Sequence, residues 1–363
     1  MKLIEISRNN HVSAYRMFVY TIVENLGLCV ELTADLQAFL DVVFWLQIVL
    51  CIVGAVGSTI AAVVCVGRKL RSSSCVLLAC VALYDVFFLL SSLVLAALAL
   101  VDSWDSSATK VFLALRNLTL WGATYTTVDI CAERCVSIAF PFLAHSRLTV
   151  GFALKRSCVI LVLGVLFTVP YVVDLINGYS VGDGCLGDRN LTTFGLVFTL
   201  YISLLLLYLL PFVAIIVINV VFAVILCRLR LRSVRPKGEN TTAEQQLSAL
   251  VLGLSGWYAV SMLVPSVIFL IRLTQIELFD PDTDIRVAAA ADTVVILSCC
   301  SNFLFYFLLW RPFRHLVCVW IREKTGSLRS SSYTTTDSSN SDRRHHCVSH
   351  HTHREVLELE SSH

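Results

Sequence analysis

Long apolar stretches alternate along this chain with short polar segments. Each stretch runs for about 20 residues or more, the length that a helix needs to cross a hydrocarbon core about 30 Å thick. Because lipid offers no hydrogen-bond partners, a segment that spans it must satisfy its own backbone, as an α-helix does. The pattern therefore predicts an all-α membrane protein, a seven-transmembrane helix bundle with helices at 42–66, 75–100, 109–133, 156–176, 194–226, 248–271 and 287–310.

A shorter amphipathic segment follows the seventh stretch. Its apolar residues recur at helical spacing, with arginines elsewhere on the helix: Phe313, Leu316, Val317, Trp320 and Ile321. This pattern is typical of a helix that lies in the membrane interface. We expect a short eighth helix there, in which Cys318 is a candidate for palmitoylation, with an ordinary interfacial thiol as the alternative.

The apolar pattern also divides the chain. Residues 1–38 are expected to form an extracellular N-terminal segment, and residues 39–325 the seven-transmembrane domain with its eighth helix. Residues 326–363 are rich in Ser, Thr and His, and they are too polar to bury a core. We expect that last segment to be a disordered cytoplasmic tail.

Composition agrees with the apolar pattern. The chain is 57% hydrophobic and only 15% charged, with a mean hydropathy of +0.77, whereas soluble chains carry about 25% charged residues. The net charge is +2, and no basic stripe with interleaved aromatic residues occurs. The lipid bilayer is therefore an expected partner, and nucleic acid is not.

Basic residues favour one orientation in the membrane. They gather in the first, third and fifth connecting segments: Arg68, Lys69, Arg71, Arg147, Lys155, Arg156, Arg228, Arg230, Arg232, Arg235 and Lys237. The alternate segments hold few: Arg189, Arg272 and Arg286. Since positive loops stay in the cytoplasm, the N-terminus is expected outside and the C-terminus inside.

Several landmark motifs lie at fixed places in these stretches. The second stretch contains "LLACVALYD", which ends in Asp85; the third ends in Glu133 and Arg134, with Pro141 seven residues after the arginine; the seventh contains "NFLFY", residues 302–306. With these motifs the chain resembles a rhodopsin-like (class A) G-protein-coupled receptor over nearly all of residues 40–325. Such a protein would lie in the plasma membrane.

The resemblance implies a switch at the cytoplasmic side. In the family, the arginine that matches Arg134 is held by its acidic neighbour, here Glu133, and on release it contacts a heterotrimeric G-protein. The sixth stretch would swing about its proline. The implied switch residues are Glu133, Arg134, Pro141, Pro265, Asn302 and Tyr306.

The resemblance also implies a polar core and a ligand pocket. Asp85, Ser298 and Asn302 match residues that surround water or sodium in the family, and we expect a wet polar cluster. The implied ligand pocket contains Arg116, Leu120, Leu263 and Asp292.

Arg116 bears on the class of ligand. It precedes Arg134 by 18 residues, so the two share a helix face about 27 Å apart. Amine receptors of the family carry an Asp at this position, so Arg116 favours an anionic group such as a carboxylate. Asp292 faces it in the family's arrangement, and a purely structural ion pair of the two remains an alternative. The expected extracellular ligand is a peptide or a polar small molecule, as in the invertebrate neuropeptide (FMRFamide-type) and chemosensory receptors that the chain resembles.

Other landmarks of the family are altered. The third stretch lacks the usual outer cysteine, so Cys185 is expected either to pair with Cys29 or to remain free. Asn190 begins a glycosylation sequon in the same outer segment. Leu263, Phe303 and Ser58 replace the usual Trp, Pro and Asn.

Three other functional classes fit the sequence less well. A membrane zinc or serine hydrolase needs intramembrane histidines, but all nine lie in expected loops or termini, so no enzyme, cofactor or metal is expected. A retinal receptor needs a lysine in the seventh stretch, which has none. A seven-helix transporter or channel is the remaining alternative, although no internal repeat is visible. The Ser/Thr-rich tail makes receptor kinase and arrestin expected partners.

Overall fold

The computed structural model of the chain describes residues 34–67, 72–100, 107–177, 202, 204–232, 239–273, 281–319 and 322. The predictions at Cys29, Cys185 and Asn190, and those for the tail at 326–363, lie outside the described residues. The chain divides into two units, Met1–Val317 and Cys318–His363. The helices α2 to α10 belong to the first unit.

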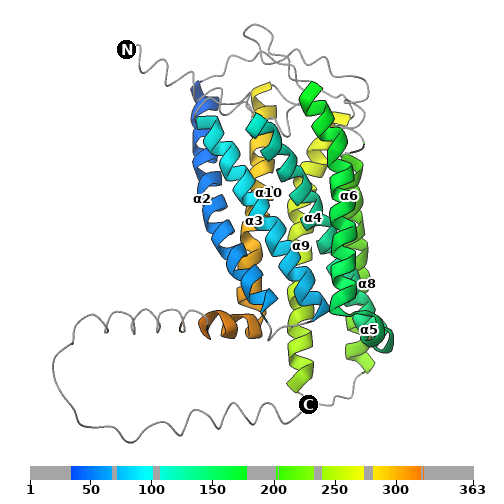
Figure 1. Ribbon diagram of the computed structural model, residues 1–363. Helices are drawn as coiled ribbons and strands as arrows, with labels where there is room; N and C mark the ends of the chain where they lie inside the picture. Colours follow the sequence, from blue (N-terminus) through cyan, green and yellow to red (C-terminus); the bar gives the residue numbers. More distant parts are fainter. Residues whose placement is uncertain are drawn as a thin grey trace, which may run out of the picture. The chain divides into compact units, whose positions relative to one another are not determined.

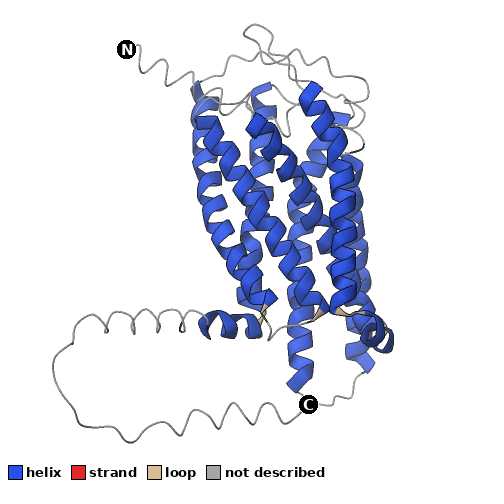
Figure 2. Cartoon of the chain, viewed as in Figure 1, coloured by secondary structure: helices blue, strands red, loops and turns tan. Residues whose placement is uncertain are grey.

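Seven long helices of the described residues run alongside one another (Figure 1). They are α2 (Ala34–Val66), α3 (Ser73–Leu100), α4 (Ser107–Ala139), α6 (Val150–Asn177), α8 (Leu210–Arg232), α9 (Glu239–Leu273) and α10 (Pro281–Leu309). A short helix, α5 (Pro141–Arg147), follows α4, and a π-helix, η3 (Leu204–Leu209), precedes α8. The described residues contain helices and short loops, with no strand among them (Figure 2). The predicted all-α seven-helix bundle is confirmed.

Six of these helices are long and apolar enough to cross a membrane: α2, α3, α6, α8, α9 and α10. The seventh, α4, is less apolar because it carries charged residues and many threonines. It packs against α3, α6, α8 and α9, and most of its central residues are buried. A central position between other helices explains how so polar a helix is accommodated in the bundle.

Several helices extend beyond their predicted ends. The first begins at Ala34 rather than at 42, and the third ends at Ala139 rather than at 133. Hydropathy marks only the part of a helix that faces lipid, whereas backbone hydrogen bonding continues into the polar interface. Glu133 and Arg134 therefore lie within the last two turns of α4, not at its end.

The fifth predicted helix has a change of backbone geometry. Pro211 is the second residue of α8, and η3 directly precedes that helix. Proline has no N–H to donate to the carbonyl four residues earlier, and single turns of π-helix occur where the regular α-helical ladder is interrupted. Pro211 indicates from the sequence that this helix can kink, but it does not predict that the interruption takes the form of a π-helix.

The predicted amphipathic segment after α10 is helical over 311–319. Phe313 and Val317 are buried, whereas Arg311 is exposed. The Phe313 ring stacks on Trp310 at a centroid distance of 6.1 Å and lies 5.7 Å from the ring of Tyr306. The apolar face thus packs on the end of α10. Cys318 is an exposed free thiol.

Candidate functional site

A buried ion pair joins α4 to α10 in the half of the bundle away from α5, which we call the far half. Arg116 donates through Nη2 to Oδ1 of Asp292. The side chains are only 7% and 3% exposed. The structure thus brings together the two charged residues of the expected ligand pocket.

Neutral side chains from two further helices surround this pair. Arg116 Nε donates to Ser92 of α3 at 3.0 Å, and its guanidinium lies 4.9 Å from the centre of the Phe88 ring. Gln47 of α2 donates to Thr293 at 2.8 Å and lies 3.4 Å from Asp292. Four helices therefore meet at one polar cluster, which we call the far-half cluster: Gln47, Ser92, Arg116, Asp292 and Thr293.

The two leucines of the expected pocket differ in position. Leu120 is buried in the apolar core of the same half. Leu263, by contrast, has 44% of its surface exposed. Leu120 therefore faces the interior of the bundle, where a ligand pocket would lie, whereas much of Leu263 lies on the surface.

The expected polar core is present in part. Asn302 of α10 donates to Asp85 of α3 at 2.7 Å, and both residues are buried. Ser298 instead bonds to Ser261 of α9, at 2.8 Å. Phe303, which stands where the family has proline, packs on Gly57, where an added Cβ would be 2.9 Å from the ring.

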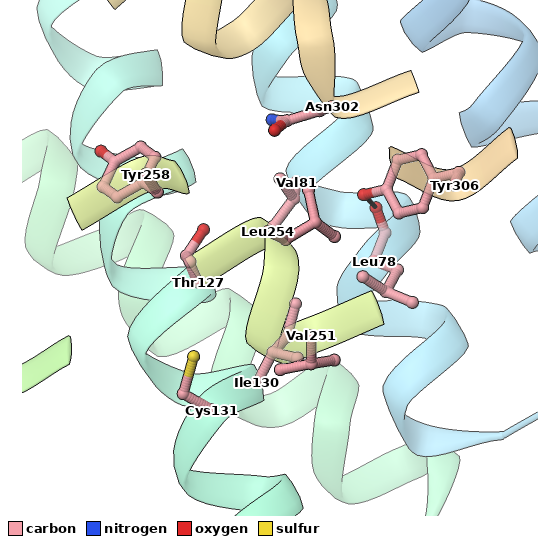
Figure 3. A pocket seen from close by; sticks show the side chains of 10 residues that line it. All are labelled: Leu78, Val81, Thr127, Ile130, Cys131, Val251, Leu254, Tyr258, Asn302 and Tyr306. Carbon is pink, nitrogen blue, oxygen red and sulfur yellow. Dashed lines mark hydrogen bonds between the residues drawn. The ribbon is translucent and has the colours of Figure 1, made fainter. Parts of the chain in front are cut away.

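A small cavity lies below Asn302, between α3, α4, α9 and α10 (Figure 3). The cavity has a volume of about 20 Å³, which is room for one or two waters. Its polar lining includes Thr127, Tyr258, Asn302 and Tyr306. The Tyr306 hydroxyl donates to the Leu78 carbonyl at 3.4 Å across its edge (Figure 3). Two of the expected switch residues therefore line this cavity.

Glu133 is buried near the α5 end of the bundle and accepts hydrogen bonds from two neighbouring helices. Ser73 of α3 donates at 2.8 Å, and Ser74 also donates. Arg156 of α6 donates to the same carboxylate. Arg134 Nη2 lies 3.6 Å from Glu133, which is an ion-pair distance but longer than a hydrogen bond.

Arg156 also reaches a second carboxylate. Its Nη1 donates to Asp129, one helical turn before Glu133, at 2.7 Å. Sequence analysis did not assign a role to Asp129, and it counted Arg156 only as a loop charge. The available signal was the i,i+4 spacing of two acids in a largely apolar helix, which calls for a cation between them.

Three hydroxyl groups on successive turns of α9 bond to three different helices. Ser255 donates to Asn219 of α8 at 2.9 Å, and Tyr258 bonds to Thr124 of α4. Ser261 donates to Ser298 of α10. These residues recur every three positions and hold one face of α9 to its neighbours. Pro265, the expected hinge, follows them within the same helix.

Pro141 begins the short helix α5. Proline is favoured at this position because its missing N–H has no partner in the first turn anyway. The next residue, Phe142, is 93% exposed. Sequence analysis missed Phe142, because an apolar residue beside an apolar stretch gives no sign that it projects outward.

One comparison with known proteins identifies the family. The sequence profile described as "7 transmembrane receptor (rhodopsin family)" matches residues 58–339, which is more than half of the chain. No curated protein matches it. The matched range includes the Asp85–Asn302 contact and the Glu133–Arg134 pair. This chain belongs to the rhodopsin family of seven-transmembrane receptors.

Proposed function

We propose that this receptor binds an extracellular ligand in its far half and activates a heterotrimeric G-protein at its α5 end. The observation that carries the proposal is the family match over residues 58–339. Receptors of this family signal in general through G-proteins. The polar clusters at the two ends of α4 supply a candidate for each task.

The orientation proposed is N-terminus outside and C-terminus in the cytoplasm, at the plasma membrane. Exposed basic residues at or near the α5 end support it: Arg147, Lys155 and Arg228. Basic residues that flank membrane helices stay in the cytoplasm. The far-half cluster would then face the extracellular side.

The proposed ligand carries an anionic group, as in a short peptide with a free carboxylate or a small organic acid. Arg116 is hydrogen-bonded to both Asp292 and Ser92. A ligand carboxylate that took the place of Asp292 would keep Arg116 paired and would release α10 from α4. This exchange gives the ligand a way to favour one arrangement of helices over another, which is what a shift of a two-state equilibrium requires.

At the α5 end, the proposed active state separates α9 from α3, α4 and α10. The small cavity already lies between these helices, and α9 can bend at Pro265 because proline removes a backbone hydrogen bond. Opening there would expose Arg134 to the G-protein. Phe142 of α5, with 93% of its surface exposed, is a candidate apolar contact for the same partner.

We also propose regulation from the C-terminal residues. Hydroxyl-rich residues 326–363 would be phosphorylated by a receptor kinase and then bound by arrestin, because phosphates create a dense negative charge for basic partners. Palmitoylation of the exposed Cys318 would anchor the adjoining helix to the membrane. The Cys29–Cys185 bridge and glycosylation of Asn190 also stay predictions.

A nucleotide-exchange assay tests the proposal. Purified receptor in nanodiscs is mixed with each class of G-protein heterotrimer and with libraries of short peptides and small carboxylic acids. We expect exchange above that of empty nanodiscs and its loss in Arg134→Ala. Lys155→Ala, which removes an exposed charge of α6, is the matched control and should retain activity.

Two outcomes would contradict the proposal. A response unchanged in Arg134→Ala would exclude the assigned switch. Ligand-driven movement of solute or ions through receptor-containing vesicles, without nucleotide exchange, would favour the alternative of a transporter or channel.

A further inference from the structure

The Glu133 carboxylate is held mainly by helices other than its own. Ser73 and Ser74 donate to it from α3, and Arg156 donates to it from α6. Arg134, its neighbour in sequence, lies 3.6 Å away. Among the contacts of this carboxylate the Arg134 contact is the longest, and Coulomb attraction weakens with distance.

Arg156 is shared between two acids. Asp129 and Glu133 are four residues apart on α4, where like charges repel each other. Arg156 lies between the two acids and binds both: its Nη1 contacts Asp129 and its Nη2 contacts Glu133. The guanidinium presents its donors in a rigid planar fork, so its two terminal nitrogens can each bond one carboxylate.

We propose that Arg156 is a positioning residue of the switch: it competes with Arg134 for Glu133 and so sets how firmly Arg134 is retained. The inference rests on the proposed G-protein coupling through Arg134. It makes α6 part of the switch, because the competing cation comes from that helix. It also gives Asp129 a role, since Asp129 competes with Glu133 for Arg156.

The charges of the four residues predict that Arg156→Gln and Asp129→Asn change the basal rate of nucleotide exchange in opposite directions. Asp129 and Glu133 carry two negative charges, and Arg134 and Arg156 carry two positive ones. Without Arg156, Arg134 is the only cation of the set left to Glu133, and the pair tightens. Without the Asp129 charge, Arg156 turns fully to Glu133, and the hold on Arg134 weakens.

Basal nucleotide exchange, measured per folded receptor in nanodiscs with purified G-protein, tests these signs. Arg156→Gln should lower the basal rate, and Asp129→Asn should raise it, each by about fivefold, the lower end of typical coupling between sites. Lys155→Gln removes the neighbouring charge, which is exposed, and should leave the rate unchanged. If Arg156→Gln does not fold, Asp129→Asn still tests the sign.

The double variant Glu133→Gln/Arg156→Gln separates positioning from general packing. Because Arg156 acts through Glu133, its replacement should have no further effect on the rate once Glu133 is uncharged. An undiminished effect in the Glu133→Gln background would overturn the proposal. So would a rise in basal rate on Arg156→Gln, or a fall on Asp129→Asn.

Thermal unfolding of the same purified variants tests the competition for Glu133 without depending on G-protein activation. Double-mutant cycles should give a larger coupling for Glu133 with Arg156 than for Glu133 with Arg134. An equal or smaller coupling would overturn the proposed competition whether or not the receptor activates a G-protein. If no variant gives exchange above empty nanodiscs, the G-protein coupling and the switch fail together, and the cycle still decides which arginine holds Glu133.

Discussion

Arg116 of α4 and Asp292 of α10 form an ion pair across the interior of the bundle, 176 residues apart in sequence. Both side chains are more than nine-tenths buried. Little of either side chain is exposed, so each charge depends on the other and on the neutral groups around it. The pair therefore fixes α4 against α10 in the far half.

Loss of either partner should destabilise the receptor strongly. Arg116→Gln would leave the Asp292 carboxylate buried without its cation. Asp292→Asn would leave the Arg116 guanidinium buried without its carboxylate. Removing one member of a buried pair costs about 3–5 kcal/mol. We expect a lower thermal unfolding temperature and less receptor at the cell surface for either variant, and a partial recovery of both in Arg116→Gln/Asp292→Asn.

Gln47→Leu is the matched comparison within the same cluster. Gln47 is neutral and donates to Thr293 and Asp292, so its loss should cost about 1 kcal/mol, as for an ordinary hydrogen bond. If the two charge variants are no more harmful than Gln47→Leu, the pair does not hold the bundle together.

Much of this arrangement could be predicted from the sequence. Apolar length alone predicts the seven helices, because lipid leaves few alternatives to a helix of about 20 residues. The resemblance to rhodopsin-like receptors implies that Asp292 faces Arg116 and that Asn302 lies near Asp85. The structure shows both contacts.

The contacts of Arg156 could not be predicted in the same way. It stands at the edge of an apolar stretch, where hydropathy alone reads a basic residue as a loop charge facing the cytoplasm. Its side chain in fact points into the bundle toward Asp129 and Glu133. Helix rotation and the approach of α6 to α4 decide this direction, and both depend on packing between helices. Pro211 indicates an interruption of its helix, but the apolar run around it does not show that the interruption is a π-helix.

Close packing of α4 against α3 gives a second prediction. A Cβ added at Gly122 would lie 2.3 Å from the Tyr84 ring, which is well inside contact distance. Gly122→Ala should therefore force Tyr84 to move, at a cost of about 1–3 kcal/mol typical of overpacking. The measurement is the thermal unfolding temperature of the purified receptor.

Gly256→Ala supplies the control for that substitution. Gly256 lies in α9, where no atom of the described residues, apart from the nearby backbone of its own helix, lies within 4 Å of an added Cβ. Alanine is favoured over glycine in a helix by about 1 kcal/mol, so this variant should be neutral or slightly more stable. Tyr84→Leu should rescue Gly122→Ala by making room. Equal behaviour of the two glycine variants would mean that Gly122 is not a point of close approach.

The contact between Tyr258 and Thr124 gives a third prediction, on signalling. Thr124 donates its one hydroxyl hydrogen to the Leu120 carbonyl at 2.7 Å, so Tyr258 is the donor in the bond between them. Tyr258→Phe keeps the ring and removes only this bond from α9 to α4. Hydrogen bonds between membrane helices contribute about 0.6 kcal/mol on average, so the closed arrangement should lose that much and basal nucleotide exchange should rise about threefold. Ser266→Ala is the control, because that buried serine bonds at 2.7 Å to the Met262 carbonyl of its own helix and, among the described residues, to no neighbouring helix. Thr124→Val should also raise basal nucleotide exchange. The double variant should give no larger rise than either single variant, because both remove the same hydrogen bond. An additive rise, or an equal rise in Ser266→Ala, would show that the contact between α4 and α9 does not restrain the opening of the α5 end.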